Sequence, residues 1–442
     1  MKATPRLTRR QFLRVTSAAA AGAPLILHSS SRAADKPSDR ITLGFIGSGK
    51  QGRILLNDFV KRPDVQVAAV CDVDWNRRES LKKHVVETYA KQTGQSSWTG
   101  CDAYGDFHEL LAREDIDAVV ISTPDHWHAL HVIAAAAADK DIYCEKPLCQ
   151  SVREARAMAD AVRVNKRVFQ MGSQQRSMRE FRTSVELIRN GVIGRINRIE
   201  VGVGGGPAVP CDLPREAEEP GLNWNHWLGP APWRPYNSTL SPRGVHDHYP
   251  AWRNYREYGG GLVTDWGAHH FDIIQWALDL DGSGPVEIFP ASEPNAQTGV
   301  RFVYASGVEA VHVPGNGLTF HGSEGKLFVA RGKFELTVGP DKKADSPAKL
   351  DDIAAEYLTA SAKRVYHSGD QHGNWLECIR SRKPTVAGAE VGARTVTVCH
   401  LVNFAYYHGQ RLKWNPEKET FADGTGDRKW LEVPYRDPWK LS

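Results

Sequence analysis

Cysteine is scarce in this chain, with seven residues in 442 and neither a Cys-x-x-Cys pair nor a repeated spacing. Structural zinc sites and disulfide frameworks depend on such spacings, so neither is expected. Five cysteines stand in apolar or strand-like stretches and are interpreted as buried thiols, namely Cys71, Cys101, Cys144, Cys149 and Cys378.

Most of the chain has no excess of positive or negative charge. The 56 basic and 52 acidic residues give a net charge of +4, but residues 1–34 contain six basic residues and no acidic one. The remainder therefore has 50 basic residues against 52 acidic ones. A body so close to neutral lacks the basic surface that nucleic-acid binding requires.

Long hydrophobic runs are missing too. The apolar run at 15–27 is short and rich in alanine, whereas a transmembrane helix needs about 20 strongly apolar residues. It follows Thr8-Arg9-Arg10-Gln11-Phe12-Leu13, which resembles a twin-arginine export signal. Residues 1–34 are therefore expected to be a signal peptide, which implies export of the folded protein to the periplasm and no membrane segment after cleavage. A retained amphipathic tail or an uncleaved anchor is the alternative.

A dinucleotide-binding motif opens the body of the chain. The apolar run 41–46 leads into Gly47-Ser48-Gly49-Lys50-Gln51-Gly52, a helical stretch follows at 53–61, and a second β-like run at 65–70 ends in Cys71-Asp72. The first glycine allows a tight turn, the second lets the backbone approach a pyrophosphate, and the third lets helix pack on strand. The helix N-terminus then faces the phosphates with free N–H groups.

Asp72 stands twenty residues beyond the last glycine of the motif. A carboxylate there can bind both ribose hydroxyls and repel a 2′-phosphate, which favours NAD over NADP. Arg77 and Arg78 carry guanidinium groups that would accept such a phosphate. We interpret them instead as the solvated first turn of a helix.

Helices and strands continue to alternate up to residue 165. Strands are predicted at 118–122 and 141–144, and helices at 106–113, 127–138 and 151–165. Such alternation predicts a doubly wound parallel sheet, a Rossmann domain over residues 40–165. Ligands bind these sheets at the carboxyl ends of the strands, where Thr123-Pro124-Asp125-His126 and Glu145-Lys146-Pro147 fall.

Those two segments, together with His128, resemble the Gfo/Idh/MocA family, named for glucose–fructose oxidoreductase and inositol dehydrogenase. The resemblance covers nearly all of residues 40–440. It implies a Rossmann domain followed by an α/β domain with a largely antiparallel open sheet, a cis Pro147, and Lys146 beside the nicotinamide and the oxidised sugar carbon. The expected cofactor-binding residues are Gly47, Ser48, Gly49, Gln51, Gly52, Asp72, Thr123, Pro124, His128 and Glu145.

Residues 166–442 are expected to form the substrate-binding and oligomerisation domain. Strands are predicted at 168–171 and 196–203 around a helix at 178–190, and alternating runs between 299 and 330 predict an antiparallel meander. Helices at 372–381 and 391–407 precede segments expected to wrap the two domains or a neighbouring subunit. The exposed face of an open sheet makes a homodimer or homotetramer the expected state.

Asp265 and His269 follow the glycine run Gly259-Gly260-Gly261 and are four residues apart, so on a helix they share a face. The family has such a D-x-x-x-H pair after a glycine run. The resemblance implies that Asp265 binds substrate and orients His269, which takes the hydroxyl proton as hydride leaves the same carbon. Lys146, Asp265 and His269 are thus the expected catalytic residues, whereas His270 and Asp272 are expected to face the sheet or other helices.

Residues 202–258 form a long irregular stretch, and stretches of this length in compact proteins are usually functional. Its tryptophans would either cover the apolar faces of a sugar or pack a minor core or an interface. His246-Asp247-His248 has no standard zinc spacing, so no metal is expected. The tryptophans concerned are Trp224, Trp227, Trp233 and Trp252, and the expected substrate contacts are Arg176, Trp252 and Arg253.

The sequence therefore predicts NAD-dependent removal of hydride from a hydroxyl of a small-molecule sugar, cyclitol or glycoside. The alternative is an NAD-dependent glycoside hydrolase or an epimerase with resident, internally recycled NAD, since glycosidases of this superfamily also carry a twin-arginine signal. Glu145-Lys146-Pro147 together with the D-x-x-x-H pair favours the dehydrogenase. The same residues argue against a non-enzymatic sugar- or nucleotide-sensing protein.

Overall fold

A computed structural model describes residues 39–441, in which the chain from Arg40 onward forms one compact unit. The expected signal peptide, residues 1–34, lies outside the described residues. From residue 39 to residue 441, no helix combines the length and apolar content needed to cross a bilayer.

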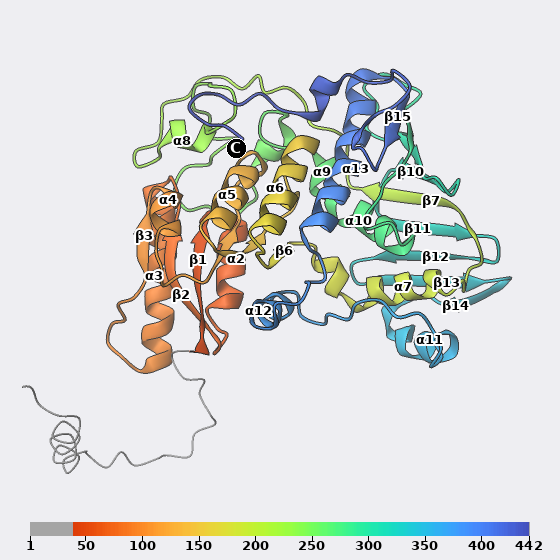
Figure 1. Cartoon of the computed structure of the whole chain (residues 1–442), viewed down its shortest axis with the longest axis horizontal. Helices are drawn as coiled ribbons and strands as arrows, with labels where there is room; N and C mark the ends of the chain where they lie inside the picture. The colour runs from red at the N-terminus through yellow and green to blue at the C-terminus, as the bar shows by residue number, and fades with distance from the viewer. Residues whose placement is uncertain (1–38, 442) are drawn as a thin grey trace, which may run out of the picture. The chain divides into compact units, whose positions relative to one another are not determined.

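The first half of this unit is built on six parallel strands in the order β3-β2-β1-β4-β5-β6. The strands are β1 (Ile41–Ile46), β2 (Val65–Cys71), β3 (Asp102–Tyr104), β4 (Ala118–Ile121), β5 (Asp141–Cys144) and β6 (Phe169–Met171). The helices around them are α2 (Lys50–Phe59), α3 (Trp75–Thr93), α4 (Phe107–Leu111), α5 (Asp125–Ala137) and α6 (Val152–Val164) (Figure 1). The predicted Rossmann sheet is confirmed.

Both faces of this sheet are covered, which explains why its strands are continuous apolar runs. In β4, Val119 and Ile121 belong to one hydrophobic cluster and Ala118 and Val120 to another, because successive side chains point to opposite faces. All four residues are fully buried.

β6 corrects the expected domain boundary. We predicted this strand as the first of the second domain, after residue 165, but it pairs in parallel with β5, with Ile142 opposite Phe169 and Cys144 opposite Met171. The hydrogen-bonding partner decides which sheet a strand joins, so the first domain extends through β6.

The second half is built on ten strands in the order β14-β13-β12-β11-β7-β10-β9-β8-β15-β16. They are β7 (Ile196–Val203), β8 (Glu287–Phe289), β9 (Arg301–Val303), β10 (Glu309–Val313), β11 (Asn316–Gly322), β12 (Gly325–Ala330), β13 (Lys333–Val338), β14 (Asp341–Ala344), β15 (Leu412–Asn415) and β16 (Thr420–Phe421). β7 pairs in parallel with β10 and antiparallel with β11. The expected meander is therefore wrong at one point, because β7 separates β10 from β11, while the largely antiparallel sheet is confirmed.

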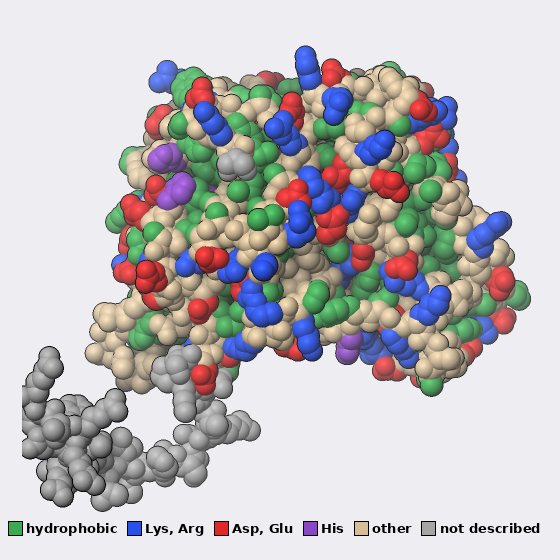
Figure 2. All heavy atoms as spheres, viewed as in Figure 1, with side chains coloured by type: hydrophobic (Ala, Val, Ile, Leu, Met, Phe, Trp, Pro, Cys, Tyr) green, Lys and Arg blue, Asp and Glu red, His purple; other side chains and the backbone are tan. Residues whose placement is uncertain are grey.

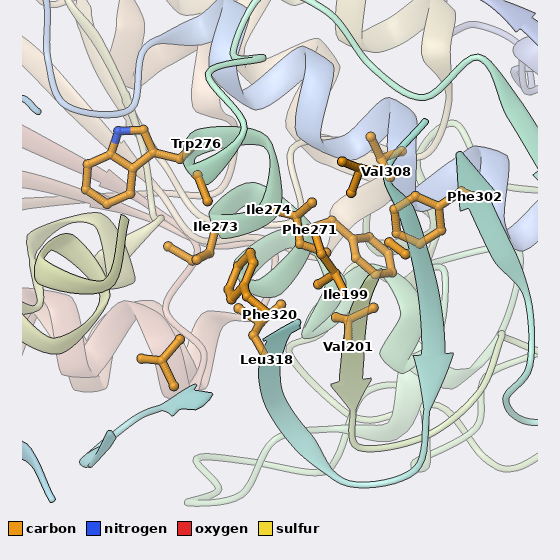
Figure 3. Close-up of a cluster of buried hydrophobic side chains, with 14 of the residues drawn as sticks. Ile199, Val201, Phe271, Ile273, Ile274, Trp276, Phe302, Val308, Leu318 and Phe320 are labelled. Atoms are coloured by element: carbon orange, nitrogen blue, oxygen red, sulfur yellow. The ribbon is translucent and has the colours of Figure 1, made fainter. Parts of the chain in front are cut away.

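Helices pack on one face of this second sheet. In Figure 3, Phe271 and Ile274 of α10 (Gly267–Ala277) lie against Ile199 and Val201 of β7 and Phe320 of β11, and all five are fully buried. The other helices of this half are α7 (Arg179–Arg189), α8 (Trp224–Leu228), α9 (Leu262–Asp265), α11 (Leu350–Tyr357), α12 (Gln371–Ser381) and α13 (Ala389–His408). The two helices predicted near the end of the chain are thus confirmed as α12 and α13.

α13 joins the two halves. Its Ala393 and Val396 belong to a hydrophobic cluster of the Rossmann sheet, and its Leu401 and Phe404 belong to the cluster of the second sheet. A single helix that is part of both cores fixes the two sheets relative to each other, and with them the walls of any site between them.

The last residues return to the first domain. The backbone N–H of Arg436 donates to the carbonyl of Pro230 at 2.9 Å, and Trp439 packs edge-on against Trp127 of α5 with ring centroids 6.1 Å apart. In Figure 1 this dark blue segment ends near α5 and α8. The predicted wrapping is therefore confirmed for residues 429–441, whereas residues 409–414, which were predicted to wrap as well, contribute to β15 of the second sheet.

Charged side chains of both signs mingle on the face seen in Figure 2, as the nearly neutral balance predicts. Arg156 is an example, since its ion pairs with Glu390 at 2.6 Å and Glu419 at 2.8 Å tie α6 to later segments. All seven cysteines are free, and the five predicted to be buried are buried.

Candidate active site

A cavity of about 560 Å³ lies at the carboxyl ends of β1, β2, β4 and β5, where the strand order reverses between β1 and β4. Doubly wound sheets bind ligands at this position. The opposite wall comes from the irregular residues 204–258, which we call the covering segment, and from α9, α10 and the turn between β12 and β13. The cavity therefore has a nucleotide end at the glycine loop and a reacting end at α9 and α10.

The three glycines of the loop have different surroundings. Gly47 has a φ of +98°, and a Cβ there would lie 2.7 Å from the carbonyl of Ser122, while a Cβ on Gly52 would lie 2.1 Å from the carbonyl oxygen of Gly47. A Cβ on Gly49 would meet nothing within 4 Å. The backbone at Gly49 thus faces open space, and α2 begins there without a side-chain cap, which fits the diphosphate of a dinucleotide.

Asp72 lines the cavity and also ties the loop to β2. Its carboxylate accepts hydrogen bonds from the backbone N–H of Ser48 at 2.7 Å and of Asp74 at 2.9 Å. Ser48 and Gly52, both expected to bind cofactor, do not line the cavity and instead shape the loop. The other expected cofactor contacts that line it are Gly47, Gly49, Gln51, Thr123, Pro124 and Glu145.

Arg77 is not the solvated helix residue that we predicted. It is 6% exposed, and its guanidinium donates to Ser241 Oγ at 3.1 Å and to the carbonyls of Pro242 and Gly244. Asp74, the N-cap of α3, holds it through an ion pair of 3.3 Å. Arg77 therefore fixes the covering segment against the nucleotide end, a role that its position in the sequence does not reveal.

Two further contacts attach the covering segment to α2. Lys50 Nζ donates to the Asp247 carboxylate at 2.8 Å and to its carbonyl at 2.9 Å. The Tyr249 hydroxyl donates to Gln51 Oε1 at 3.0 Å. The covering segment is thereby fastened over the first turn of α2, where a diphosphate would lie.

Some tryptophans of the covering segment pack in a small hydrophobic core, and others line the cavity. Trp224 and Trp227 stack with centroids 4.7 Å apart in a small core, although Trp227 also reaches the cavity. Trp233 is 62% exposed and lies away from the cavity, whereas Trp252 lines it and stacks on Arg253, which lines it too.

At the reacting end, Lys146 precedes a cis Pro147, as predicted, and contacts Asp265. Its Nζ donates to Asp265 Oδ1 at 2.5 Å and to the Asp265 carbonyl at 3.0 Å. That carbonyl can accept a hydrogen bond from the lysine because α9 ends at Asp265. The backbone N–H groups of His269 and His270 donate to the carbonyl of Trp266 instead. Burial alone raises the pKa of the Asp265 carboxyl, but Lys146 and then Arg253 hold it below its ordinary value.

His269 lies next to that pair and is 4% exposed. The guanidinium of Arg331 donates to Nε2 of His269 at 2.9 Å, and Nδ1 is buried and has no hydrogen-bond partner among residues 39–441. Burial, followed by the charges of Lys146 and Arg331, holds the pKa of His269 well below its ordinary value. The imidazole is therefore neutral, with the lone pair at Nε2, and its polar contact is Arg331 rather than the Asp265 that the family resemblance implied.

Two more carboxyl groups stand close by. Asp125, at the start of α5, is buried, and burial raises the pKa of its carboxyl well above the ordinary value despite the opposing charge of Arg253. Burial also raises the pKa of Glu145, which accepts a hydrogen bond from Gln51 Nε2 at 3.0 Å. Asp125 could have been found from its place at the end of a buried parallel strand.

Two expected contacts are wrong. Arg176 is 2% exposed and does not line the cavity, because Asp272 at 2.7 Å and Asp281 at 2.6 Å hold its guanidinium in the interior. The ring nitrogens of His128 both lie 2.9 Å from carbonyl oxygens, those of Pro147 and Thr123, so it supports the cis-proline turn instead of a cofactor. His270 and Asp272 face the interior as predicted, with His270 bonded to the Gly202 carbonyl.

Arg331 is a second residue of the reacting end, after Asp125, that sequence analysis missed. It stands in the Arg331-Gly332 turn between β12 and β13, and such a turn between two alternating strands can be recognised in the sequence. Nothing in the sequence places that turn next to His269, which is about sixty residues away. Between residues 39 and 441, no group of three or more His, Cys, Asp and Glu side chains is arranged to hold a metal ion.

Comparison with known proteins agrees with this arrangement. Residues 41–173 match the NAD-binding Rossmann fold of the oxidoreductase family GFO_IDH_MocA, and residues 210–441 match that family's C-terminal alpha/beta domain. The first domain is thus an NAD-binding domain.

Two curated relatives from Shewanella match part of the chain. A glycosyl hydrolase family 109 protein of Shewanella baltica and an alpha-N-acetylgalactosaminidase of Shewanella oneidensis are each 29% identical over 205 residues, which is 42% of this chain. The match spans 44% of the length of each relative.

Solved structures share the fold over most of the chain. Aldose-aldose oxidoreductase of Caulobacter crescentus, 18% identical, gives a TM-score of 0.58 over 85% of this chain and 99% of its own. The WlbA dehydrogenase of Bordetella pertussis, in complex with NADH and UDP-GlcNAcA, is 15% identical and gives 0.58 over 85% and 98%. With both domains matched in order, the chain belongs to the Gfo/Idh/MocA family of oxidoreductases.

Proposed function

We propose that this protein is an NAD-dependent enzyme that removes hydride from a hydroxyl-bearing carbon of a sugar, cyclitol or glycoside. The observation that carries the proposal is the neutral imidazole of His269 beside the Lys146–Asp265 pair, in the same cavity as the glycine loop. NAD, when bound, supplies the hydride acceptor. The loop at Gly47–Gly52 would hold its diphosphate, and Asp72 its ribose.

His269 is the proposed general base. As the substrate C–H bond breaks and its electron pair leaves as hydride, the hydroxyl proton passes to His269 Nε2 and a C=O bond forms. A neutral histidine suits that transfer once the Arg331 guanidinium, which donates to Nε2 in this structure, leaves the lone pair to the substrate hydroxyl. Lys146 places a positive charge beside the oxygen on which negative charge develops, in a site with little water to screen it. Asp265 positions Lys146 through two contacts instead of orienting His269.

We propose further that NAD stays bound between turnovers. The covering segment is attached over the glycine loop by Arg77, by Lys50 with Asp247 and by Gln51 with Tyr249. A cofactor enclosed in this way favours a reaction that returns the hydride to the same sugar or to a second one. This distinguishes the proposal from a dehydrogenase that exchanges free NAD at each turnover.

A glycoside hydrolase with resident NAD is the second candidate. The observation that favours it is the similarity of 205 residues to relatives named as glycosyl hydrolase family 109 proteins. Such an enzyme oxidises a sugar carbon, eliminates the aglycone from the neighbouring position, adds water and returns the hydride. The early steps need the same base, so Lys146, Asp265 and His269 serve both candidates.

One set of measurements tests these proposals. Purified protein is passed through gel filtration, and its NAD content is determined by mass spectrometry. The same holoenzyme is then mixed with a panel of sugars, uronic acids, cyclitols and nitrophenyl glycosides, while NADH fluorescence and nitrophenol release are followed. Bound NAD that is reduced by a free sugar supports the oxidoreductase, and nitrophenol release without added NAD supports the hydrolase. If no member of the panel produces either signal, both proposals are contradicted.

We also propose that residues 1–34 direct export by the twin-arginine route to the periplasm. Arg9 and Arg10 in Thr8-Arg9-Arg10-Gln11-Phe12-Leu13 support this proposal. Replacing both arginines by lysine is expected to leave the folded protein in the cytoplasm. Unchanged delivery of the double variant, measured by cell fractionation, would contradict it.

A further inference from the structure

We propose that the substrate carries a carboxylate and that Arg331 binds it beside His269. This inference rests on the proposed function and names its substrate class: sugar acids, such as uronic acids and their glycosides. It concerns Arg331, which the proposed hydride transfer does not itself require.

Arg331 points a guanidinium into the cavity without an acidic partner. Within residues 39–441 no carboxylate forms an ion pair with it, and the contact of its guanidinium with a polar group is the hydrogen bond to His269 Nε2. The guanidinium also lies over the Trp266 ring, 4.8 Å from its centroid. A planar cation held over an aromatic face, with its remaining N–H groups free, is the geometry that binds a carboxylate through two parallel hydrogen bonds.

The turn that carries Arg331 is fixed in place. The N–H of Gly332 donates to Glu180 Oε1 of α7 at 3.0 Å, and Gly332 has a φ of +68°, which glycine adopts without strain. β12 and β13 pair from Gly325 opposite Val338 to Ala330 opposite Lys333. The backbone of the turn that carries Arg331 is therefore positioned by the second sheet and by α7, while the hydrogen bond to His269 and the Trp266 ring hold its guanidinium.

Carboxylates act on Arg331 only from a distance: Glu145, Asp265 and Glu180 favour its charged form, but within residues 39–441 none of them forms an ion pair with it. Lys146 and Arg253 both face Asp265, at 2.5 and 3.9 Å. Burial raises the pKa of the Asp125 carboxyl well above its ordinary value, so this group does not supply a compensating negative charge. A carboxylate on the substrate would supply it.

Arg331 also covers the nitrogen that must accept the proton. While the guanidinium donates to His269 Nε2, the lone pair of the base is occupied. A substrate carboxylate that accepts the hydrogen bonds of the guanidinium replaces His269 as their acceptor. The Nε2 lone pair is then available to the hydroxyl of the same sugar. Binding of the acid group would thus prepare the base, whereas a neutral sugar has to displace Arg331 without any compensating contact.

Matched pairs of sugars test the inference. The holoenzyme is given methyl glucuronoside and methyl glucoside, and methyl galacturonoside and methyl galactoside, while reduction of bound NAD and quenching of tryptophan fluorescence are measured. We expect the acid of at least one pair to exceed its neutral partner by about 10- to 100-fold in the second-order rate constant for reduction of bound NAD, the factor typical of a hydrogen bond to a charged group. In Arg331→Gln that preference should disappear, and in Arg331→Lys it should survive in part.

Lys333→Gln is the matched control, since it removes the same charge two residues away at an exposed position that does not line the cavity. It should keep the preference for the acid. Equal second-order rate constants for acid and neutral sugars would overturn the inference and leave the proposed function standing. If no sugar reduces NAD, the proposed function fails. In that case quenching of tryptophan fluorescence tests the inference. Saturable binding of the sugar acid that is lost in Arg331→Gln supports the inference, and a lack of such binding overturns it.

Discussion

The nucleotide end and the reacting end of the cavity hold their charged groups in different ways. At the nucleotide end, both oxygens of Asp72 accept backbone N–H groups, and Arg77 is buried among an ion pair, a hydroxyl and two carbonyls. At the reacting end, Asp265 is shared by two cations, and Arg331 donates only to a neutral imidazole.

This difference indicates that one end of the cavity retains the cofactor and that the other end reacts with the substrate. Charges whose hydrogen bonds are already satisfied by the protein fix the shape of a site and keep a cofactor in place. Charges that lack a partner respond to what enters, because a new ligand can satisfy them. The nucleotide end is therefore expected to control retention of NAD, and the reacting end to control rate and substrate choice.

The largest effect is expected at the reacting end. Loss of a general base costs about 10²- to 10⁴-fold in rate, so His269→Ala should lower the single-turnover reduction of NAD by that factor while NAD remains bound. His270→Ala is the control, because its neighbouring imidazole is equally buried but bonds to the Gly202 carbonyl outside the cavity. A rate in His269→Ala equal to that of the wild type would remove this histidine from the reaction.

At the nucleotide end, Arg77→Ala should shorten the retention of NAD without slowing hydride transfer. The loss of charged hydrogen bonds to the covering segment, about 1.5–3 kcal/mol, corresponds to roughly 10- to 150-fold faster dissociation of NAD. Lys83→Ala, on the exposed face of the same helix, serves as the control. NAD release is followed by competition with a fluorescent analogue. Retention unchanged in Arg77→Ala would contradict a fastening role for the covering segment.

A smaller effect is expected for Asp72→Ala. Removing the carboxylate should weaken NAD binding by about 1–2 kcal/mol, because a hydrogen bond to a charged group is lost and the loop loses the acceptor of the Ser48 N–H. NADP should lose less or gain, since the repulsion of its 2′-phosphate is relieved. Titration calorimetry with both cofactors measures the ratio. A wild-type protein that binds NADP more tightly than NAD would contradict the role of Asp72 and leave Arg78 as the residue that determines cofactor choice, because the guanidinium of Arg77 is already bound within the protein.

The smallest effect is a shift in pH dependence. Burial, Lys146 and Arg331 all oppose a proton on His269, so its pKa lies well below the ordinary value near 6.5. The single-turnover rate should therefore stay flat as the pH falls through that value and decline only at lower pH. Arg331→Gln removes one of the opposing charges and should move the decline to higher pH. A wild-type rate that already halves near the ordinary value would show that His269 is not the group titrating.

Much of the nucleotide end could be predicted from the sequence. The glycine loop, Asp72 and the Lys146-Pro147 turn are each defined by neighbouring residues, because a turn, a strand end and a helix start are local events. Arg77 was misinterpreted for the same reason: its position in the first turn of a helix is typical of solvated residues, and its partners Ser241 and Pro242 come from a segment without regular structure.

The sequence by itself determined the two α/β domains, the cofactor loop and the residues brought to the ends of the parallel strands. Periodicity and glycine spacing carry that information, since they follow from the geometry of helices and strands. Only the tertiary structure decided that Asp265 pairs with Lys146, that Arg331 faces His269, that Arg176 is held by Asp272, and that the covering segment encloses the loop. Each of these contacts joins residues about sixty or more positions apart. Their partners are set by how the two sheets and α13 pack, and no local pattern in the chain records that packing.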